Sequence, residues 1–226
     1  MNMIDADMAQ PGLTIRANSQ SGGKGQRGKN WADIPGQSLL MSIISCPIRP
    51  LNEQFVFNAS VTNAIADVLQ DLYGNWNIHI KWPNDIIIND KKAGGVLIEN
   101  VLRGQQWTYS IIGLGLNVKQ TDFPPELPFA TSLKMGSGRD FELTVLRDLL
   151  REKILESTSV LSPIKTVMEA YNEHLFRRGK VQSFADGQRE WDAIVLHANA
   201  DGTLQVQTED GKIVSYTHGA TLWNWK

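Results

Sequence analysis

The stretch that decides the fold runs from Ile78 to Val118 and reads IHIKWPNDIIINDKKAGGVLIENVLRGQQWTYSIIGLGLNV. It carries little of the apolar periodicity of an amphipathic helix. Its segments are short, rich in β-branched and aromatic residues, and separated by Asn-Asp, Asp-Lys-Lys and Arg-Gly breaks. This pattern predicts a meander of neighbouring antiparallel strands at 78–83, 85–90, 94–102 and 107–118.

Segments on either side of this meander complete a mixed domain. Upstream, the sequence predicts strands at 12–20 and 38–46 and then a helix at 52–74 that ends at a glycine. Downstream, helical periodicity predicts helices at 141–161 and 162–176. The first of these two is expected to bury one apolar face made of Leu143, Leu146, Leu149, Leu150 and Ile154. The predicted fold class is therefore α+β, with a mixed, mainly antiparallel sheet and helices.

The composition changes after the Arg-Arg-Gly at 177–179. The remaining residues hold four or five short β-rich segments separated by Ala-Asp-Gly, Ala-Asp-Gly and Glu-Asp-Gly turns, which predicts a small β-barrel of the SH3-like kind. We therefore expect two domains, at 1–176 and 177–226, packed closely because no low-complexity linker separates them.

Bulk composition excludes several classes of function. A net charge of -2 and a pI near 6.1 argue against a general nucleic-acid surface, which needs clustered Lys and Arg. No stretch approaches the length of a membrane span, and the N-terminal segment is acidic, so we expect a cytoplasmic protein with no membrane partner. The four histidines show no metal-ligand spacing. Cys46 lies in an apolar run and is expected to be reduced and buried.

The glycine-rich segment at 22–31, GGKGQRGKNW, contains two phosphate-binding patterns, G-x-G-x-x-G and G-x-x-x-x-G-K. A P-loop needs a hydroxyl after Lys29, where this chain has Asn30, and both motifs need a helix to begin at the loop. Pro35 and Gly36 end any such helix within one turn. Two interpretations remain: a cationic loop that wraps an anion with its backbone N–H groups, or a mobile surface hairpin tip.

The last strand of the meander combines glycines with apolar residues. Strand alternation places Gly113, Gly115 and Asn117 on one face, and Gly95 repeats the arrangement on the preceding strand. A bare backbone patch of this kind lets a flat or apolar ligand lie against the sheet, although the glycines could instead mark bulges. Lys81 points away from the apolar face of its strand, as a ligand-binding lysine or as a solvated one.

Four blocks together resemble the biotin protein ligase family, biotin-[acetyl-CoA-carboxylase] ligase. They are GKGQRGKNW at 23–31, KWPND at 81–85, KAGGVLIE at 92–99 and GLGLN at 113–117, and the resemblance covers about residues 13–120. The resemblance implies the class II synthetase-like fold of biotin and lipoate ligases, followed by a small C-terminal barrel. The family does not begin a helix at its glycine-rich loop, so the loop is interpreted as an anion-binding flap.

The resemblance also implies a two-step reaction. ATP and biotin would form biotinyl-5'-AMP, and a lysine of a biotin carboxyl carrier protein would then take the biotinyl group. Mg²⁺ would accompany ATP, and Asp85 is one candidate among its unnamed ligands. No nucleic-acid partner is implied for this chain.

Family roles carry over onto individual positions. Lys81 and Arg27 would be catalytic, because their charges stabilise the anions that develop on phosphate and carboxylate. The residues expected to bind biotin are Gln20, Gly23, Lys24, Gly25, Gly95, Gly113 and Gly115. The residues expected to bind the nucleotide are Trp31, Asn84, Asp85 and Asn117.

The chain departs from the family pattern in two places. Gln26 replaces the second Arg of the family's G-R-G-R loop, which leaves adjacent Arg27 to clamp phosphate. We also expect the first stretch of the catalytic domain, about twenty residues with a Ser/Thr-Asn segment, and the helix-turn-helix domain to be missing. Two alternatives therefore stay open: a lipoate or octanoate ligase or transferase, and a catalytically impaired biotin-binding module. Exposed sheet edges leave both a homodimer and a monomer open.

Overall fold

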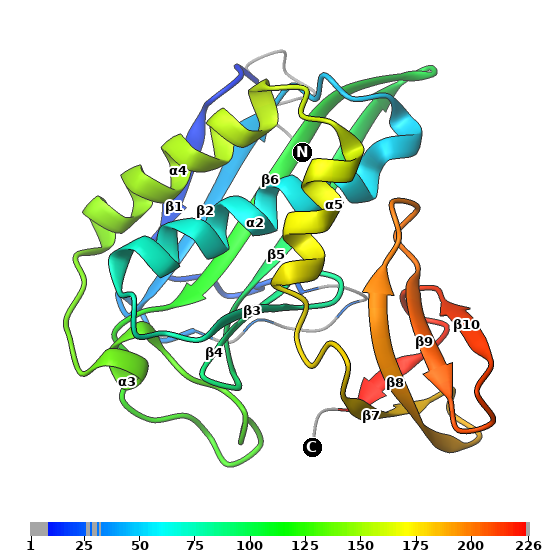
Figure 1. The fold of residues 1–226 in the computed structure, drawn as a ribbon. Helices are drawn as coiled ribbons and strands as arrows, with labels where there is room; N and C mark the ends of the chain where they lie inside the picture. Colours follow the sequence, from blue (N-terminus) through cyan, green and yellow to red (C-terminus); the bar gives the residue numbers. More distant parts are fainter. Residues whose placement is uncertain (1–8, 26–27, 29–30, 32, 225–226) are drawn as a thin grey trace.

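A computed structural model describes residues 9–25, 28, 31 and 33–224, and it has the expected α+β fold with two antiparallel sheets (Figure 1). The first sheet has six strands in the order β1-β2-β6-β5-β4-β3. These strands are β1 Thr14–Ala17, β2 Ser38–Ser45, β3 Ile78–Lys81, β4 Asp85–Ile88, β5 Lys91–Arg103 and β6 Gln106–Asn117. The four strands of the predicted meander are β3 to β6, so that prediction is confirmed, and β5 begins at Lys91 rather than at residue 94.

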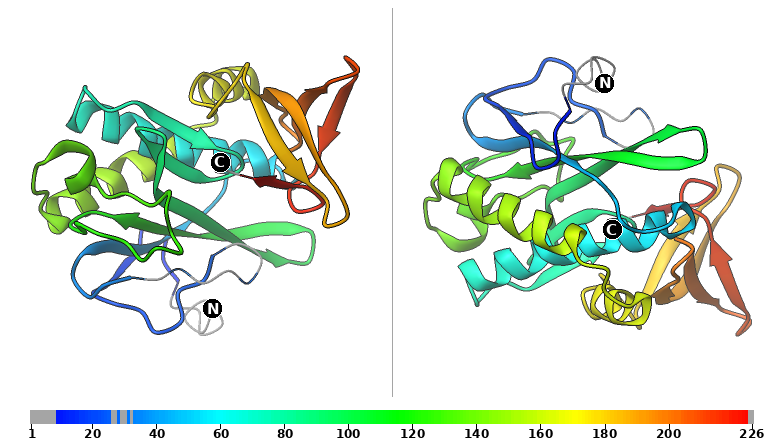
Figure 2. Two further views of the ribbon diagram at one scale, coloured as in Figure 1. Left: turned by 90° about the horizontal axis from the view of Figure 1, so that it is seen from below. Right: turned by 90° about the horizontal axis from the view of Figure 1, so that it is seen from above.

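Three long helices cover one face of this sheet (Figures 1 and 2). They are α2 Gln54–Leu72, which follows the short η2 Leu51–Glu53, α4 Leu143–Ser159 and α5 Ile164–Glu173. A single turn, α3 Leu133–Ser137, lies between β6 and α4. The helices pack on the apolar residues of β2, β4 and β6, and these side chains form one buried core. Burying such a face removes apolar surface from water and is the main stabilising contribution to the domain.

The apolar face of α4 differs from the prediction at one position. Leu143, Leu146, Leu150 and Ile154 are buried as expected, but Leu149 is 41 % exposed. Successive residues of an α-helix are turned by about 100°, so Leu149 points well away from the stripe that contains Leu150. The prediction that Leu149 belongs to the core is wrong.

The second sheet has five strands in the order β10-β9-β8-β7-β11. Their bounds are β7 Val181–Ala185, β8 Glu190–Ala198, β9 Leu204–Thr208, β10 Ile213–Tyr216 and β11 Leu222–Asn224. β10 and β11 are the two ends of this order, and the turn between them contains the isolated bridge His218↔Thr221. The small β-domain is as expected, but its sheet stays open there and is not a closed barrel.

The segment after α5 connects the two sheets. Leu175 forms a parallel bridge with Ile80 at the end of β3, and the N–H of Ile80 donates to the carbonyl of His174 at 2.7 Å. Asn172 binds Ala198 of β8 in both directions, with distances of 3.0 and 2.7 Å. The second sheet is therefore anchored beside the end of β3, as Figure 1 shows.

Two further predictions can be compared with the structure. Cys46 is exposed, contrary to the expectation that it is buried, because it follows the last residue of β2 and leaves the core there. Among the helices of the described residues, none is long and apolar enough to cross a membrane.

Candidate functional site

One row of residues runs across four neighbouring strands of the first sheet. Gly115 of β6 is the direct partner of Gly95 of β5, Gly95 is the partner of Asp85 of β4, and Asp85 is the partner of Lys81 of β3. Directly opposed residues of an antiparallel sheet lie on the same face, about 4.5–5.5 Å apart. The row therefore presents bare backbone at one end, a carboxylate in the middle and an ammonium group at the other end.

The row lies on the face of the sheet that the helices leave open. Leu114 and Leu116, the neighbours of Gly115, point into the core and are buried. β1 is the edge strand of this sheet, and the described residues that follow it lie on the side away from the helices (Figure 2). Among the described residues of the glycine-rich segment, Trp31 reaches this face, because its indole lies over Gly95 and Gly115.

Trp31 covers the glycine end of the row. A Cβ added to Gly115 would lie 2.8 Å from Cε2 of the indole, and one added to Gly95 would lie 3.7 Å from Cζ3. The N–H of Trp31 donates to the carbonyl of Gly23 at 2.9 Å, which ties this residue to the start of the glycine-rich loop. Its indole Nε1 is buried and has no hydrogen-bond partner among the described residues. A buried N–H without a partner is costly, so this donor is suited to an acceptor on a ligand.

Gly113 provides a second bare position beside the covered pair. A Cβ added there would meet only Leu97, with its carbonyl oxygen at 3.3 Å and its Cβ at 4.0 Å. Leu97 is the cross-strand partner of Gly113 on β5. The notch at Gly113 is therefore floored by backbone and lies two residues from Gly115 on the same face of β6.

Lys92 joins the row from a position that the sequence reasoning did not select. Its Nζ lies 2.6 Å from Oδ1 of Asp85 and 5.7 Å from the ring centroid of Trp31. The pairing of β4 with β5 shifts register between Ile86 and Ile87, and such a bulge re-aims the side chains beside it. The bulge brings Lys92 to the face that carries Gly95. Its place directly before the Ala-Gly-Gly sequence was the only signal in the sequence.

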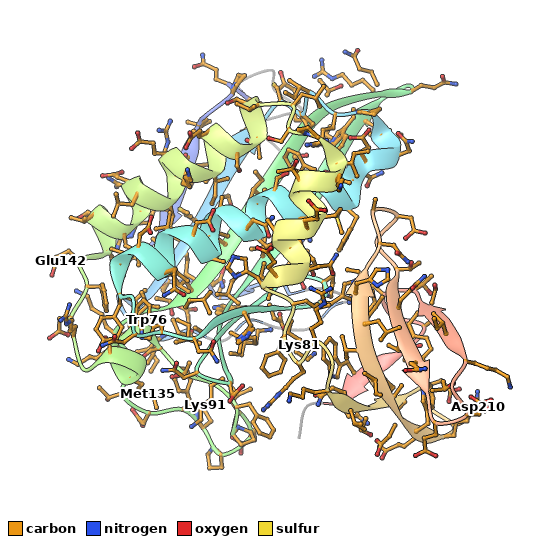
Figure 3. The ribbon with its side chains drawn as sticks, in the orientation of Figure 1. Trp76, Lys81, Lys91, Met135, Glu142 and Asp210 are labelled. Atoms are coloured by element: carbon orange, nitrogen blue, oxygen red, sulfur yellow. The ribbon has the colours of Figure 1, made fainter. Side chains whose placement is uncertain are left out.

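Lys81 reaches the boundary between the two sheets (Figure 3). Its Nζ lies 5.0 Å from the ring centroid of Trp223 on β11. The next residue, Trp82, is buried, and its Nε1 donates to the carbonyl of Gly202 in the β8–β9 turn at 3.1 Å. The ring of Trp82 also meets His218 edge-on, with centroids 5.4 Å apart. The C-terminal sheet therefore packs directly against the end of β3.

The turn between β3 and β4 is fixed by buried polar groups. The carbonyl of Pro83 accepts from Nδ2 of Asn58 at 2.9 Å and from the hydroxyl of Tyr171 at 3.0 Å. Asn84 is buried; its side-chain amide donates to the carbonyl of Val96, and its own carbonyl accepts from the N–H of Val96 at 3.1 Å. Burial, and secondarily the charge of Asp85, raises the pKa of Tyr171 well above its usual value, so its hydroxyl stays a donor.

Asn117, expected near the nucleotide, is buried at the end of β6. Its Nδ2 donates to the carbonyl of Thr131 at 3.0 Å, and its Oδ1 accepts from Gln120 at 3.4 Å. The same loop contacts Lys92, whose N–H donates to the carbonyl of Phe129 at 2.7 Å and whose carbonyl accepts from the N–H of Thr131 at 2.9 Å. The segment 129–131 is thus a wall of the site that the sequence did not indicate.

The remaining predicted residues lie in the glycine-rich loop. Gly23 is buried against the side-chain amide of Gln20 and the carbonyl of Trp31, so these three residues are brought together. Gly25 is half-buried, and Lys24 is exposed. Arg27, like Gln26, lies outside the described residues.

The acidic residues and histidines near the row form no metal-binding cluster in the described part of the chain. Within 9–25, 28, 31 and 33–224, no three His, Cys, Asp or Glu residues group so that they could hold a metal ion. The carboxylate of Asp85, the one acid in the row, already pairs with Lys92. The row is instead suited to an anion, with an ammonium group at one end, and to an apolar body on the bare backbone at the other.

Comparisons with known proteins identify the family of this chain. Residues 3–117 match the Biotin/lipoate A/B protein ligase family. The chain is 33% identical over 171 residues to the bifunctional ligase/repressor BirA of Bacillus subtilis, which covers 72% of this chain and 52% of that protein. It is 34% identical over 236 residues to human biotin--protein ligase, with 95% and 31% covered. The chain thus spans about half the length of the bacterial relative and less of the human one.

Solved structures show the same fold. The biotin protein ligase of Aquifex aeolicus, solved in complex with biotin and ATP, superposes with a TM-score of 0.80 at 22% identity. The superposition covers 96% of this chain and 91% of that one. At this identity the likeness establishes the fold alone.

Proposed function

The chain belongs to the biotin/lipoate A/B protein ligase family, and we propose that it is a biotin protein ligase that uses ATP. The observation that carries the proposal is the row Gly115–Gly95–Asp85–Lys81, which joins an apolar resting place to an ammonium group on one open face of the sheet. The human relative is named a biotin--protein ligase, and the Bacillus subtilis relative is named a bifunctional ligase/repressor.

In the first step, an oxygen of the biotin carboxylate attacks the α-phosphorus of ATP. The bond from that phosphorus to the bridging oxygen breaks, pyrophosphate leaves with the electron pair, and biotinyl-5'-AMP forms. Lys81 contributes by stabilising negative charge that grows on the phosphoryl oxygens in the transition state. Its charge also draws two anions together whose mutual repulsion would otherwise keep them apart.

The bicyclic ring of biotin would lie in the notch at Gly113, with its chain running along the row toward Lys81. This path requires the indole of Trp31 to withdraw from Gly115 and to pack on the ligand, where its unpaired Nε1 finds an acceptor. An indole over the mixed anhydride would exclude water from a bond that hydrolyses easily. Lys92 would keep Asp85 neutralised so that its carboxylate does not repel the phosphates.

In the second step, the amine of an acceptor lysine attacks the acyl carbon of the adenylate. An amide forms, AMP leaves, and the attacking nitrogen loses a proton. We propose a biotin carboxyl carrier protein as the acceptor. Lys81 would again stabilise the oxyanion and the departing phosphate.

Mg²⁺ fits this site as a companion of the ATP phosphates and not as a resident ion. Asp85 is the one carboxylate in the row, and it is engaged with Lys92. An ion bound by phosphate oxygens needs only one or two protein carboxylates. When bound, it would neutralise phosphate charge.

The experiment is to incubate the purified chain with ATP and labelled biotin, with and without a biotin carboxyl carrier domain. We expect biotinyl-5'-AMP without the carrier and labelled carrier with it. A carrier whose acceptor lysine is replaced by arginine is the control and should stay unlabelled. Parallel reactions with octanoate and lipoate test the alternative activity, and transfer of these acids in place of biotin would refute the proposal. Biotin binding without adenylate would instead identify a catalytically impaired module.

A further inference from the structure

Trp223, near the end of the described chain, places an aromatic face on the ammonium group of Lys81. The Nζ of Lys81 lies 5.0 Å from the ring centroid, within the range of a cation–π interaction. The two residues come from different sheets, β3 and β11, and lie far apart in the sequence. We propose that Trp223 is a positioning residue for Lys81 in adenylate formation, an inference that rests on the function proposed above.

The indole of Trp223 is itself held firmly. Trp223 on β11 is the cross-strand partner of Phe184 on β7, and the centroids of their rings lie 5.7 Å apart. Phe176, which follows the bridge to β3, contributes a third ring at 6.3 Å. The Nε1 of Trp223 donates to Oε1 of Gln182 at 3.3 Å. The hydrogen bond at Nε1 and the packing against two neighbouring rings hold the indole in place, so it offers Lys81 a rigid platform.

Lys81, by contrast, has a long and flexible side chain. Fixing such a side chain costs conformational entropy. If the side chain becomes ordered only during the reaction, this cost adds to the activation free energy and lowers the rate. The platform orders the ammonium group before ATP binds. Trp223 therefore acts through Lys81 and has no need to touch the substrate.

An aromatic face suits this role better than a carboxylate. The attraction comes from the ring quadrupole, so it neither neutralises the ammonium group nor removes a proton from it. An arriving phosphate or carboxylate carries full charges and attracts the ammonium group more strongly than the ring does. Lys81 can thus leave the ring for the substrate.

Docking of the two sheets does not depend on this contact. Trp82 already binds the carbonyl of Gly202 and packs on His218, and Asn172 binds Ala198. A substitution that removes the indole of residue 223, with its hydrogen bond to Gln182, is therefore expected to change the order of Lys81 while the sheets stay together.

The test compares Trp223→Met with Trp223→Phe in the full chain. The rate of pyrophosphate release with saturating biotin gives kcat and KM for ATP. Met keeps an unbranched apolar side chain without a π-face, and we expect kcat to fall about threefold to tenfold, the size of a partly desolvated cation–π interaction. Phe keeps a weaker face and should lose less than Met. The larger change should be in kcat, because Lys81 acts in the transition state.

Trp191→Met is the matched control. Trp191 lies in the same sheet, its ring faces Arg189 at 5.2 Å, and its Nε1 donates to Tyr216 at 2.5 Å. This variant also loses a cation–π pair and a hydrogen bond, but neither involves Lys81, so kcat should be unchanged. An equal loss of kcat in Trp191→Met and Trp223→Met would overturn the proposal, because both would then act through the stability of the sheet.

Site-specific incorporation of fluorinated tryptophan at 223 covers the case in which Trp223→Met does not fold. Each added fluorine weakens the ring quadrupole at nearly constant shape. We expect kcat to fall with each added fluorine. If the unmodified protein forms biotinyl-5'-AMP but kcat does not change along the series, the role of Trp223 is refuted and the proposed function is not. Absence of biotinyl-5'-AMP with the unmodified protein would refute the proposed function, and this inference with it.

Discussion

Replacing Gly115 by alanine tests whether Trp31 lies on the bare backbone of the row. The new Cβ would lie 2.8 Å from Cε2, 3.1 Å from Nε1 and 3.2 Å from Cδ2 of the indole. Non-bonded carbon atoms prefer about 3.5–4.0 Å, so the ring has to move outward by about 1 Å. Overpacking of this kind costs about 1–3 kcal/mol of the free energy of unfolding.

The same substitution should behave differently once the indole is gone. A Trp31→Ala background removes the three atoms nearest to the new methyl group, and alanine in a strand is more stable than glycine by about 0.5–1 kcal/mol. The two substitutions should therefore be coupled by about 1.5–4 kcal/mol, destabilising with Trp31 present and stabilising without it.

The assay is urea unfolding of the four ligand-free proteins of this double-mutant cycle. Gly113→Ala serves as the control on the same face of β6, because its Cβ would meet only Leu97 and its effect should be the same with and without Trp31. An equal cost of Gly115→Ala in both backgrounds would refute the position of the indole.

Three further predictions concern the reaction and the stability of the fold. Lys81→Ala should reduce adenylate formation at least about 100-fold while the protein still unfolds cooperatively, and retention of more than about a tenth of the wild-type rate would remove Lys81 from the mechanism. Lys92→Met should slow pyrophosphate release because it leaves the carboxylate of Asp85 unpaired beside the phosphates, whereas Lys91→Met, a change at an exposed neighbour, should not. The carboxylate of Asp67, with Oδ1 3.7 Å from Nε2 of His174, raises the pKa of that histidine above its usual 6.5. The free energy of unfolding of wild type should exceed that of Asp67→Asn by the full amount below about pH 6.5, and this difference should disappear as the pH rises through the raised pKa of His174. A difference that grows with pH in unfolding measurements would contradict this.

Local patterns predicted the parts of this structure that depend on local physics. Alternation and turn residues predicted the strands from β3 to β6, because side chains of a strand point alternately to its two faces. The same alternation placed Gly113 and Gly115 opposite the buried Leu114 and Leu116. Helical periodicity predicted α4, although it did not separate Leu149 from the buried stripe.

The site depended on contacts that no local pattern encodes. The alignment of Gly115, Gly95, Asp85 and Lys81 in one row follows from the register of three strand pairs. The contribution of Lys92 depends on a bulge, since without the shift its side chain would point to the other face.

Contacts between segments far apart in the chain could not be predicted from the sequence either. Trp31 was expected on the nucleotide side, but its position over the two glycines is set by how the loop lies across the sheet. The platform that Trp223 offers to Lys81 depends on the docking of the second sheet. Such contacts follow from tertiary packing, which propensity and periodicity do not describe.

The most direct test of the central claim is the crystal structure of this chain with biotinyl-5'-AMP bound. We predict the biotin ring beside Gly113, the indole of Trp31 moved off Gly115, and Nζ of Lys81 at about 2.7–3.2 Å from an oxygen of the acyl phosphate. The adenylate bound elsewhere, with Trp31 still lying on the two glycines, would contradict the account.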